Sequence, residues 1–523
     1  MNGGYHDAGD LTATGNTPGI SYALFSLAGQ LHESGHDPAL QKRVLEEAEW
    51  GLNWVLKTRF GDGFRSTGQL ISYWTNGVIG DGDDRHGEAV NDPEWNFRVS
   101  SLEAMAARVL KDSDSELANR SLATAKEDWH FAVTGLTTAM PIAPVYGQKD
   151  ELERNSIGAL ASVDLYQATG DQKYADEAFA LAKLVLASQE RKLQQWSIPL
   201  TGYFYSSPAK GTLFQRFHLG EEQAPIVVLA RLCKVFPDNP DWMKWYSALV
   251  LHSKYYLETA AKVNEPYSVL AAGIYRESDA KYISGKKEWT PLRAADSDAY
   301  LAEVRAGVPL GGEFYLRRFP VWFDFRGNFS VLLSQAKALS TEAELRGDAA
   351  GTDLAAKQAE WVVGRNPFAA SMMYGEGYDW TPLYSVRSGQ MVGALPVGIE
   401  AKGFADAPYW PNQTGWTYKE VWTHSVGRWL WLMADLADRK PALIPTFKVK
   451  TEHANGSDDV TIRATGAHRF ALRPDNLEVS GPTILPAGTF EWHCKITESQ
   501  SPWVAVIVPD GNLEERQEAT AVR

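Results

Sequence analysis

Between residues 17 and 437, apolar side chains recur every three or four positions, which is the spacing of one face of an α-helix. In the first such segment Pro18 stands where a helix begins and Gly35 where it ends, with Ile20, Leu24 and Leu31 on one face between them. The same pattern predicts about eleven helices. They are expected at 17–35, 38–59, 96–110, 114–132, 153–168, 171–188, 221–235, 240–262, 326–346, 352–363 and 418–437.

Long loops rich in aromatic residues separate several of these helices. They occupy 61–95, 190–220, 264–325 and 366–417, whereas other helices are joined by short turns such as "ATGD". Long loops that open together on one end of a helical array are typical of a binding face. We therefore expect the functional residues to lie in these loops.

After residue 445 the pattern changes to an alternation of apolar and polar residues, as in "VTIRAT" and "PWVAVIVP". Short alternating segments with turn residues between them predict a small β-sandwich. The stretch 440–445 is bracketed by prolines and would be the linker. The sequence thus predicts a mainly α fold, with a helical domain at 1–440 followed by a C-terminal β-sandwich domain at 446–523.

Composition narrows the class of protein. The 523 residues are enough for two domains, and the formal net charge of -14 disfavours a nucleic-acid partner, whose phosphates attract clusters of Lys and Arg. No run of about 18 apolar residues is present, so no membrane segment is predicted. Two cysteines exclude a disulfide framework. The 19 Trp and 21 Tyr are rings of the kind that stack on sugars, although most of them will be core residues.

The opening stretch "NGGYHDAGD" sets Asp7 and Asp10 three residues apart. Aspartate is also common in loops and helix caps, so this pair alone does not define a site. Glycoside hydrolysis needs one carboxylic acid to protonate the leaving oxygen and a second carboxylate to activate water or attack carbon. The best distant partner is Glu420 in "GWTYKEVWTHSV", where burial among rings such as Trp416 and Tyr418 would raise its pKa, as a general acid requires.

These stretches resemble glycoside hydrolase family 9, which is best known for inverting cellulases. The resemblance covers about residues 3–437, and the ordered combination of motifs is more specific than any one of them. The motifs are "GGYHDAGD", "RNSIGALASVDLYQATGDQKYADEA", "RGNFSVLLSQAKALSTEAELRGD", "WVVGRNPFAASMMYGEG" and "YKEVWTHSVGRWLWLMADL".

The resemblance implies an (α/α)6 barrel of twelve helices whose loops form a sugar-binding cleft. On the matching positions, Asp10 would be the general base, Asp7 would help to hold the attacking water, and Glu420 would be the general acid. An inverting enzyme needs about 6.5–9.5 Å between its carboxyl groups, because the water must fit between base and sugar.

In the family the loop with the two aspartates follows the first barrel helix, whereas here it opens the chain. About eleven of the twelve helices are predicted, and an incomplete barrel would expose an apolar flank. We therefore expect a separate N-terminal segment to complete the barrel. The first residues carry no signal peptide, and we expect the full-length form to be secreted or periplasmic.

Cellulases of the family usually carry a His-rich segment with Arg at the stretch that corresponds to 377–398, and this segment holds the sugar at the cleavage point. Here the stretch contains no histidine. Trp380, Tyr384 and Arg387 would bind the sugar in its place. Arg387 suits an acidic sugar, or equally a structural salt bridge. His424 is expected on the same helix face as Glu420, where packing is its more ordinary role. The other expected substrate-binding residues are Tyr5, His6, Trp74, Trp416 and Tyr418.

A metal site is not assigned. The loop "GDGDDRHGE" at 80–88 offers oxygen ligands of the kind that calcium accepts, and relatives often bind calcium. Its order does not match an EF-hand loop, because Arg85 and Gly87 stand at the wrong places, so a solvated charged loop is the favoured interpretation. We expect no required cofactor, with a structural calcium ion as the alternative.

The sequence therefore predicts an inverting glycoside hydrolase that cleaves a β-linked glucan or a related polysaccharide or oligosaccharide. Its partner would be carbohydrate, with neither nucleic acid nor membrane. One alternative is a polysaccharide lyase, which would explain Arg387 but leaves Asp7, Asp10 and Glu420 without a joint purpose. The other is a non-catalytic carbohydrate-binding relative, which has no reason to keep buried acids.

Overall fold

The computed structural model describes most of the helical region and the strands of the C-terminal region. The described residues are 3–7, 11–13, 16–66, 68–70, 78–80, 89–137, 151–215, 219–282, 297–320, 327–380, 382–384, 391–402, 405–437, 448–453, 458–466, 470–475, 477–485, 488–497, 503–507 and 516–520.

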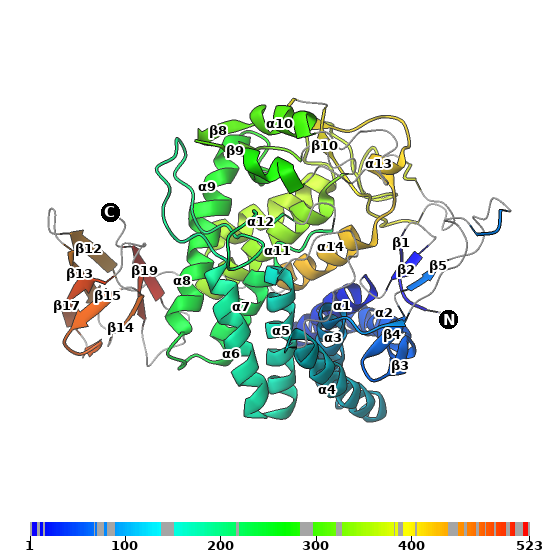
Figure 1. Ribbon diagram of the computed structural model, residues 1–523, viewed down its shortest axis with the longest axis horizontal. Helices are drawn as coiled ribbons and strands as arrows, with labels where there is room; N and C mark the ends of the chain where they lie inside the picture. The colour runs from blue at the N-terminus through cyan, green and yellow to red at the C-terminus, as the bar shows by residue number, and fades with distance from the viewer. Residues whose placement is uncertain are drawn as a thin grey trace.

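Six helices form a closed inner ring, in which each helix contacts the next and the last contacts the first (Figure 1). They are α1 (Thr17–Ser34), α3 (Pro93–Leu110), α5 (Glu151–Thr169), α7 (Ala224–Val235), α11 (Phe329–Arg346) and α14 (Thr423–Leu436). A helix enclosed on all sides buries residues around its whole circumference, and the polar residues among them need hydrogen-bond or charge partners. In α11 every residue except Glu344 is buried, so this helix lies at the centre of the core.

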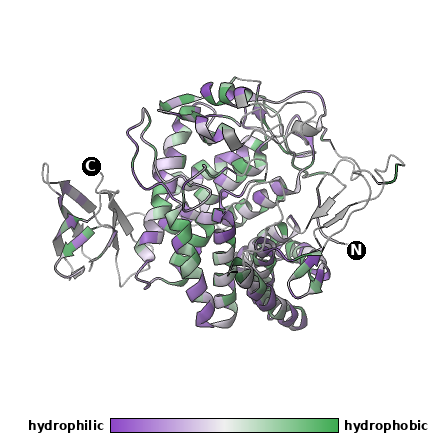
Figure 2. Cartoon of the chain, viewed as in Figure 1, coloured by the Kyte–Doolittle hydropathy of each residue, from purple (hydrophilic) through white to green (hydrophobic). Residues whose placement is uncertain are grey.

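Five further helices pack outside this ring, each against the inner helix that precedes it. They are α2 (Pro38–Lys57), α4 (Ser115–Thr137), α6 (Gln172–Ala187), α8 (Trp242–His252) and α12 (Ala349–Val362). The rod that starts with α8 continues through a π-helical turn (Ser253–Leu257), α9 (Glu258–Ala261) and a 3-10 turn (Lys262–Asn264). Figure 2 shows hydrophobic residues where α6, α7 and α8 face one another and hydrophilic residues toward the free helix ends.

The ring has six inner positions, and five outer helices lie within the described part of the chain. No sixth outer helix among the described residues packs against both α14 and α1. On α14 the apolar side chains of Trp429, Leu430, Met433 and Leu436 are only half-buried. The eleven long helices agree with the number expected from the sequence, and a segment that completes the barrel stays a prediction.

The connections are short at one end of the barrel and long at the other. The short connections follow the C-terminal ends of inner helices, at 35–37, 111–114, 170–171, 236–241 and 347–348. The long loops therefore all lead into the N-terminal ends of inner helices. Since each outer helix returns the chain to the same end, these loops gather on one face of the barrel.

Small antiparallel sheets stiffen the long loops. One contains β1 (His6–Asp7), β2 (Leu11–Ala13) and β5 (Gly68–Leu70); another contains β3 (Arg59–Gly61), β4 (Phe64–Ser66) and β6 (Ala89–Val90); a third contains β7 (Gly273–Arg276), β8 (Val308–Gly311) and β9 (Phe314–Arg317); and a fourth pairs β10 (Glu400–Ala401) with β11 (Pro408–Tyr409).

Two sequence predictions about helices are wrong. A helix at 264–325 was not expected, yet α10 (Ser297–Arg305) forms there because Tyr300 and Val304 pack on Tyr275 of β7. The helix expected at 418–437 begins only at Thr423 and is preceded by a single turn, α13 (Trp416–Lys419). Between them the chain is extended, so Glu420 does not lie on a helix.

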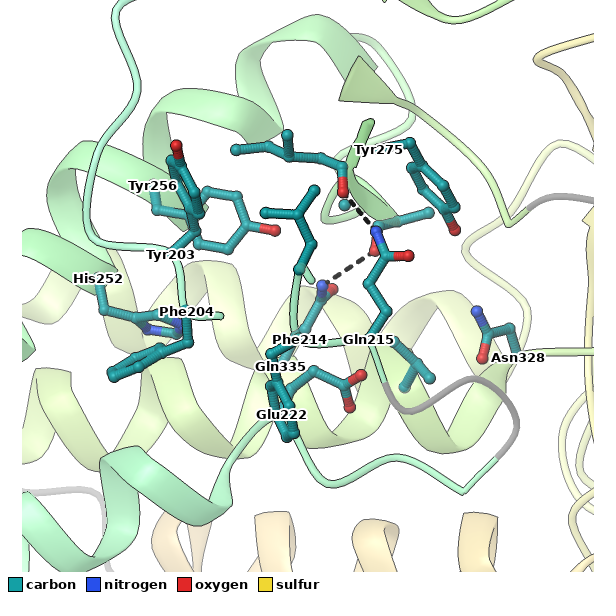
Figure 3. Close-up of a pocket in the computed structure, with 15 residues that line it drawn as sticks. Tyr203, Phe204, Phe214, Gln215, Glu222, His252, Tyr256, Tyr275, Asn328 and Gln335 are labelled. Carbon is teal, nitrogen blue, oxygen red and sulfur yellow. Dashed lines mark hydrogen bonds between the residues drawn. The ribbon is translucent and has the colours of Figure 1, made fainter. Parts of the chain in front are cut away.

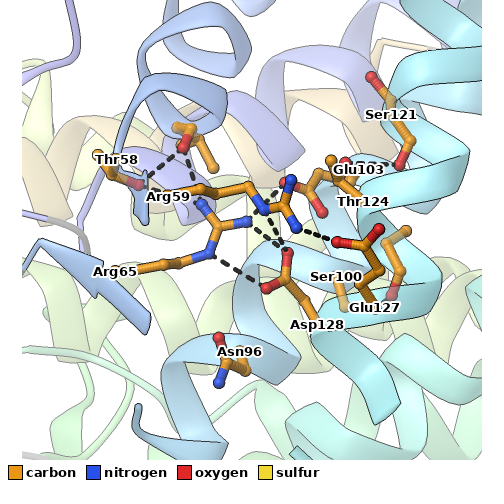
Figure 4. A network of polar contacts seen from close by, with 12 residues as sticks. Thr58, Arg59, Arg65, Asn96, Ser100, Glu103, Ser121, Thr124, Glu127 and Asp128 are labelled. Atoms are coloured by element: carbon orange, nitrogen blue, oxygen red, sulfur yellow. Dashed lines mark hydrogen bonds and ion pairs between the residues drawn. The ribbon is translucent and has the colours of Figure 1, made fainter. Parts of the chain in front are cut away.

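A buried charge network ties β4 to the inner and outer helices beside it (Figure 4). The Arg65 guanidinium donates to Glu103 Oε1 of α3 at 2.9 Å and to the Asp128 carboxylate of α4. It also donates to the Val55 carbonyl at 2.8 Å. Burial, followed by the charge of Asp128, raises the pKa of Glu103 well above its usual range. The positive charge of Arg65 therefore offsets the free-energy cost of burying the carboxyl groups of Glu103 and Asp128 next to each other.

The C-terminal region forms two four-stranded antiparallel sheets, which agrees with the predicted strands, and their organisation as a separate β-sandwich domain stays a prediction. One contains β12 (Lys448–His453), β13 (Asp459–Gly466), β17 (Gly488–Ile496) and β15 (Leu477–Ser480); the other contains β16 (Ile484–Leu485), β14 (Phe470–Asp475), β18 (Trp503–Ile507) and β19 (Arg516–Thr520). Alternate residues of β13 and β17 are buried, which is the period-two pattern of a half-covered sheet. The boundary predicted at 440–446 falls on residues outside the described part.

The sheet that contains β14 and β18 contacts α8 through these two strands, on the side of the barrel opposite β1 and β2 (Figure 1). The contact is anchored by Asp475, which is buried and accepts from Arg191 at 2.5 Å and from Ser247 at 2.6 Å. None of the helices within the described residues is both long enough and apolar enough to cross a membrane.

Candidate active site

Glu420 is held by backbone pairing rather than by a helix. Its own segment makes a parallel bridge with Tyr384, in which Tyr384 N donates to Lys419 O at 2.7 Å and Val421 N donates to Tyr384 O at 2.9 Å. On its other side, Val397 N donates to Glu420 O at 2.8 Å. The side chain is 9% exposed, so a carboxyl group is fixed just beneath the surface of the loop face.

The aromatic residues next to Glu420 are largely buried. Tyr418 and Trp422 are 7% and 2% exposed, and Tyr418 packs edge-on against Tyr409 with 5.5 Å between ring centroids. The predicted apolar surroundings of the glutamate are therefore present. The side chain of Trp416 lies outside the described residues.

His424 does not share a helix face with Glu420, contrary to the sequence prediction. It is the second residue of α14, whereas Glu420 precedes that helix in extended conformation, with φ -60° and ψ 131°. The imidazole of His424 stacks on Trp422 at 4.6 Å between ring centroids. This packing is the ordinary role expected for it, and a contact with substrate stays a prediction.

Lys419, the residue next to the candidate acid, has a structural role in this loop. Its ammonium is buried, donates to the Asn412 carbonyl at 3.1 Å and lies 5.0 Å from the centre of the Trp410 ring. Burial lowers the pKa of Lys419. The lysine therefore pins the preceding loop to the segment that carries Glu420.

The N-terminal segment lies on the same face as Glu420. Asn16 Nδ2 donates to Thr423 Oγ1 at 3.3 Å, and Tyr5 N donates to Thr17 Oγ1 at 3.1 Å. Strand β1, which contains Asp7, pairs antiparallel with β2. Asp10 and the side chain of Asp7 lie outside the described residues, so their roles stay predictions.

The Tyr5 and His6 side chains differ in their surroundings. Tyr5 packs on α2, where its hydroxyl donates to the Glu47 carbonyl at 2.6 Å and its ring lies against Gly51. Burial raises the pKa of Tyr5. His6 is exposed on β1. Tyr5 thus fastens the N-terminal segment to the barrel, and a direct contact of either residue with sugar remains predicted.

Trp380 and Tyr374 form an aromatic pair in the loop that also contains Tyr384. Trp380 is 40% exposed and packs edge-on against Tyr374, with 4.6 Å between ring centroids. Tyr384 is half-buried. An exposed indole at the loop face is available to stack on a sugar ring. Two other expected substrate contacts, Arg387 and Trp74, lie outside the described residues.

Beneath these loops, a buried charge network that sequence reasoning missed ties inner helices together. Arg98 Nη1 of α3 contacts Glu221 Oε1 at 2.9 Å, and its other nitrogen contacts Glu153 of α5. Arg428 of α14 pairs with the same Glu221 and donates to the Gly220 carbonyl at 2.5 Å. Burial alone would lower the pKa of Arg98, but the charges of Glu221 and Glu153 outweigh burial and raise it. These ion pairs connect α3, α5 and α14 near their N-terminal ends, beneath the loop face.

The described residues contain no group of three His, Cys, Asp or Glu side chains arranged to hold a metal ion. Most of the acidic loop at 80–88 lies outside them, so calcium binding there is untested. The loop face of the helical barrel thus carries a buried glutamate, exposed and half-buried aromatic residues, and buried ion pairs beneath them.

The chain belongs to glycosyl hydrolase family 9, whose family model matches residues 1–384. Among solved structures it is similar to the cellulase Cel9M of C. cellulolyticum, with 15% identity, coverage of 83% of this chain and 86% of that one, and a TM-score of 0.51. It is also similar to an endoglucanase from the termite Nasutitermes takasagoensis, with 15% identity, 83% and 88% coverage and a TM-score of 0.51.

A third similar structure is the endoglucanase CelQ from Clostridium thermocellum complexed with cellotriose, with 15% identity, 98% and 84% coverage and a TM-score of 0.52. At this identity the likenesses establish the barrel fold. A search of curated protein sequences finds no match.

Proposed function

We propose that the protein is an inverting glycoside hydrolase that cleaves a β-linked glucan or a related polysaccharide or oligosaccharide. The observation that carries this proposal is the placement of Glu420: a buried carboxyl group, fixed by backbone bridges to Tyr384 and Val397, on the face that also holds β1. Family membership and the likeness to cellulases and endoglucanases support the same reaction class.

In this proposal Glu420 protonates the glycosidic oxygen as the bond to the anomeric carbon breaks. Asp10 removes a proton from a water molecule, which attacks the anomeric carbon from the opposite side, and Asp7 helps to hold that water. The anomeric configuration is inverted, because a single displacement occurs. We propose that no cofactor takes part in these steps; a structural calcium ion in the acidic loop is the alternative to a solvated charged loop. Since polymeric substrates do not enter cells, we propose that the full-length protein acts outside the cytoplasm.

The test is release of reducing ends from β-glucans, glucosaminans and acidic polysaccharides by the wild type, Asp10→Asn and Glu420→Gln. Loss of a positioned general acid or base costs about 10²–10⁴-fold in rate. Both variants should fall by this amount, and the product of the wild type should show the inverted anomer. Glu376→Gln is the matched control, because Glu376 is an exposed glutamate of the same loop.

Other outcomes contradict the proposal in distinct ways. Formation of an unsaturated product that absorbs in the ultraviolet would identify a lyase. Affinity for the polysaccharides without turnover would identify a binding protein. Activity that survives in both variants would refute the assigned roles of Asp10 and Glu420.

A further inference from the structure

The N-terminal ends of α1 and α14 are joined by two side chains that the proposed chemistry does not use. Asn16, the N-cap residue of α1, donates through Nδ2 to Oγ1 of Thr423 at 3.3 Å, and Thr423 is the first residue of α14. Thr423 follows Glu420 by three residues. This hydrogen bond therefore connects the start of the first barrel helix to the segment that carries the candidate acid.

Asn16 does not use its side chain to cap its own helix. An asparagine at an N-cap usually accepts a hydrogen bond from a backbone N–H of the first helical turn. Asn16 makes no such side-chain bond within α1, all of whose residues the structure describes. Its backbone carbonyl accepts from Ile20 N at 3.2 Å, as a regular helix requires. The side-chain amide is directed to α14 instead, so Asn16 joins two helices rather than stabilising one.

Asn328 of α11 is also an N-cap residue whose side chain does not cap its helix, but its surroundings differ. It lines a recess between the N-terminal ends of α7 and α11, together with Glu222 and Gln335 (Figure 3). The space in this recess is about 30 Å³, which is about the volume of one water molecule and too small for a sugar ring. The recess therefore offers the reaction no subsite, whereas the contact of Asn16 reaches the segment of Glu420 directly.

One turn further along each helix, α1 and α14 approach each other closely. A Cβ at Gly427 of α14 would lie 3.0 Å from Cγ1 of Ile20, which is tighter than ordinary van der Waals contact. The distance between packed helices depends on the side chains at their contact. The glycine therefore keeps the two helices close together, and the hydrogen bond between Asn16 and Thr423 fixes their ends at that spacing.

On the side of the candidate acid, the chain between Glu420 and Thr423 is extended. The backbone ψ angles of Glu420 and Trp422 are 131° and 116°. Three extended residues span at most about 11 Å. The bridge with Tyr384 holds Glu420 within its loop, and Thr423 holds the same short stretch to the barrel. A displacement of Thr423 is therefore passed on to Glu420.

On the side of the candidate base, the N-terminal segment is attached to the beginning of α1. Tyr5 N donates to Thr17 Oγ1 at 3.1 Å, and Thr17 directly follows Asn16. Strand β1 pairs with β2, which Asp10 directly precedes in the sequence. The N-terminal segment thus keeps to the end of α1, and the side-chain hydrogen bond sets where this end lies relative to the start of α14.

We propose that Asn16 and Thr423 are positioning residues, which set the separation between the general acid and the general base. The inference rests on the proposed hydrolase function. An inverting enzyme works within a window of about 6.5–9.5 Å between its carboxyl groups, because a water molecule must fit between base and sugar. A misplacement of about 1 Å can cost about 100-fold in rate. Loss of the hydrogen bond therefore slows the chemical step and leaves substrate binding nearly unchanged.

The experiment measures kcat and KM on the polysaccharide that the wild type hydrolyses best. Thr423→Val replaces the acceptor hydroxyl with a methyl group of similar size, and kcat should fall about 10–100-fold while KM changes less than about twofold. Thr423→Ser keeps the hydroxyl and should retain kcat within about threefold of the wild type. In Asn16→Ala kcat should fall as in Thr423→Val, and the double variant should lose no more than either single variant, since both remove the same contact.

Ser425→Ala is the matched control. Ser425 also lies in the first turn of α14 and is fully buried, but among the described residues its hydroxyl has no hydrogen-bond partner, so kcat should stay at the wild-type value. Wild-type kcat in Thr423→Val, a rise in KM without a fall in kcat, equal losses in Thr423→Ser and Thr423→Val, or additive losses in the double variant would overturn the positioning role while leaving the hydrolase intact. If the wild type releases no reducing ends from any substrate, the hydrolase fails and the positioning role fails with it.

Discussion

Replacing Arg65 by Met should expose how strongly the network of Figure 4 depends on one cation. Arg65 is 1% exposed, and its partners Glu103 and Asp128 are fully buried. Met fills much of the space of the arginine stem, so the cost is mainly electrostatic. Removal of one partner from a buried ion pair costs about 3–5 kcal/mol, and we expect the free energy of unfolding to fall by that amount at pH 7.

The dependence on pH has a definite sign. In the folded protein the pKa of Glu103 is raised by burial and by Asp128, above its unfolded value of about 4.3. Folding therefore favours the protonated acid, and the penalty from an ionised Glu103 is relieved as pH falls. Without the guanidinium this effect grows, so the stability deficit of Arg65→Met should be smaller at pH 5 than at pH 7.

Chemical denaturation followed by far-ultraviolet circular dichroism measures this deficit, since helices dominate the signal. Arg365→Met is the control: Arg365 pairs with Glu360, and both side chains are about half exposed, at 50% and 53%, so this change should cost about 1 kcal/mol or less. Adding Glu103→Gln to Arg65→Met should recover part of the loss. A deficit below about 1 kcal/mol, or one that increases as pH falls, would refute the reasoning.

Three further outcomes follow from the packing. Gly398→Ala should lower the free energy of unfolding by about 2 kcal/mol or more and reduce the rate of hydrolysis, because a Cβ at this position would lie 2.3 Å from the Phe329 ring. Chemical denaturation and rate assays measure the two effects. Wild-type values in both would contradict the close approach. Asp475→Ala removes the buried partner of Arg191, and faster proteolytic release of the C-terminal domain should result; unchanged cleavage would show that the anchor is dispensable. Burial raises the pKa of Cys494 to about 11, so little thiolate exists at pH 8, and the native protein should react with a disulfide reagent there far more slowly than the denatured protein.

The ends of a helix could be predicted from the sequence where residues that begin or end helices stand at those positions. The first helix begins at Thr17 with Pro18 in its first turn and ends at Gly35, whose φ of 65° is the left-handed conformation that glycine readily adopts. Such ends are specified by a few neighbouring residues. They were therefore predicted to within one residue.

The site was harder to predict because its contacts join distant parts of the chain. The local pattern predicted a helix around Glu420, but this residue instead forms a β-bridge with Tyr384, 36 positions earlier. A rule that uses only neighbouring residues does not predict such a pairing. The ion-pair network beneath the loop face joins Arg98 to Glu221, 123 residues apart. Charges in the first turns of predicted inner helices were the one available signal for it, and they do not reveal which partners meet. The roles of Asp10, Trp74 and Arg387 stay predictions.

The attachment of Glu420 to its loop rather than to α14 bears on how this enzyme family diversifies. The candidate acid, Tyr384 and the segment 397–399 form one backbone unit, while the barrel below is held by its own ion pairs. Insertions elsewhere in the loop would therefore shift Glu420 and Tyr384 together, while the helices of the barrel stay where their own ion pairs hold them.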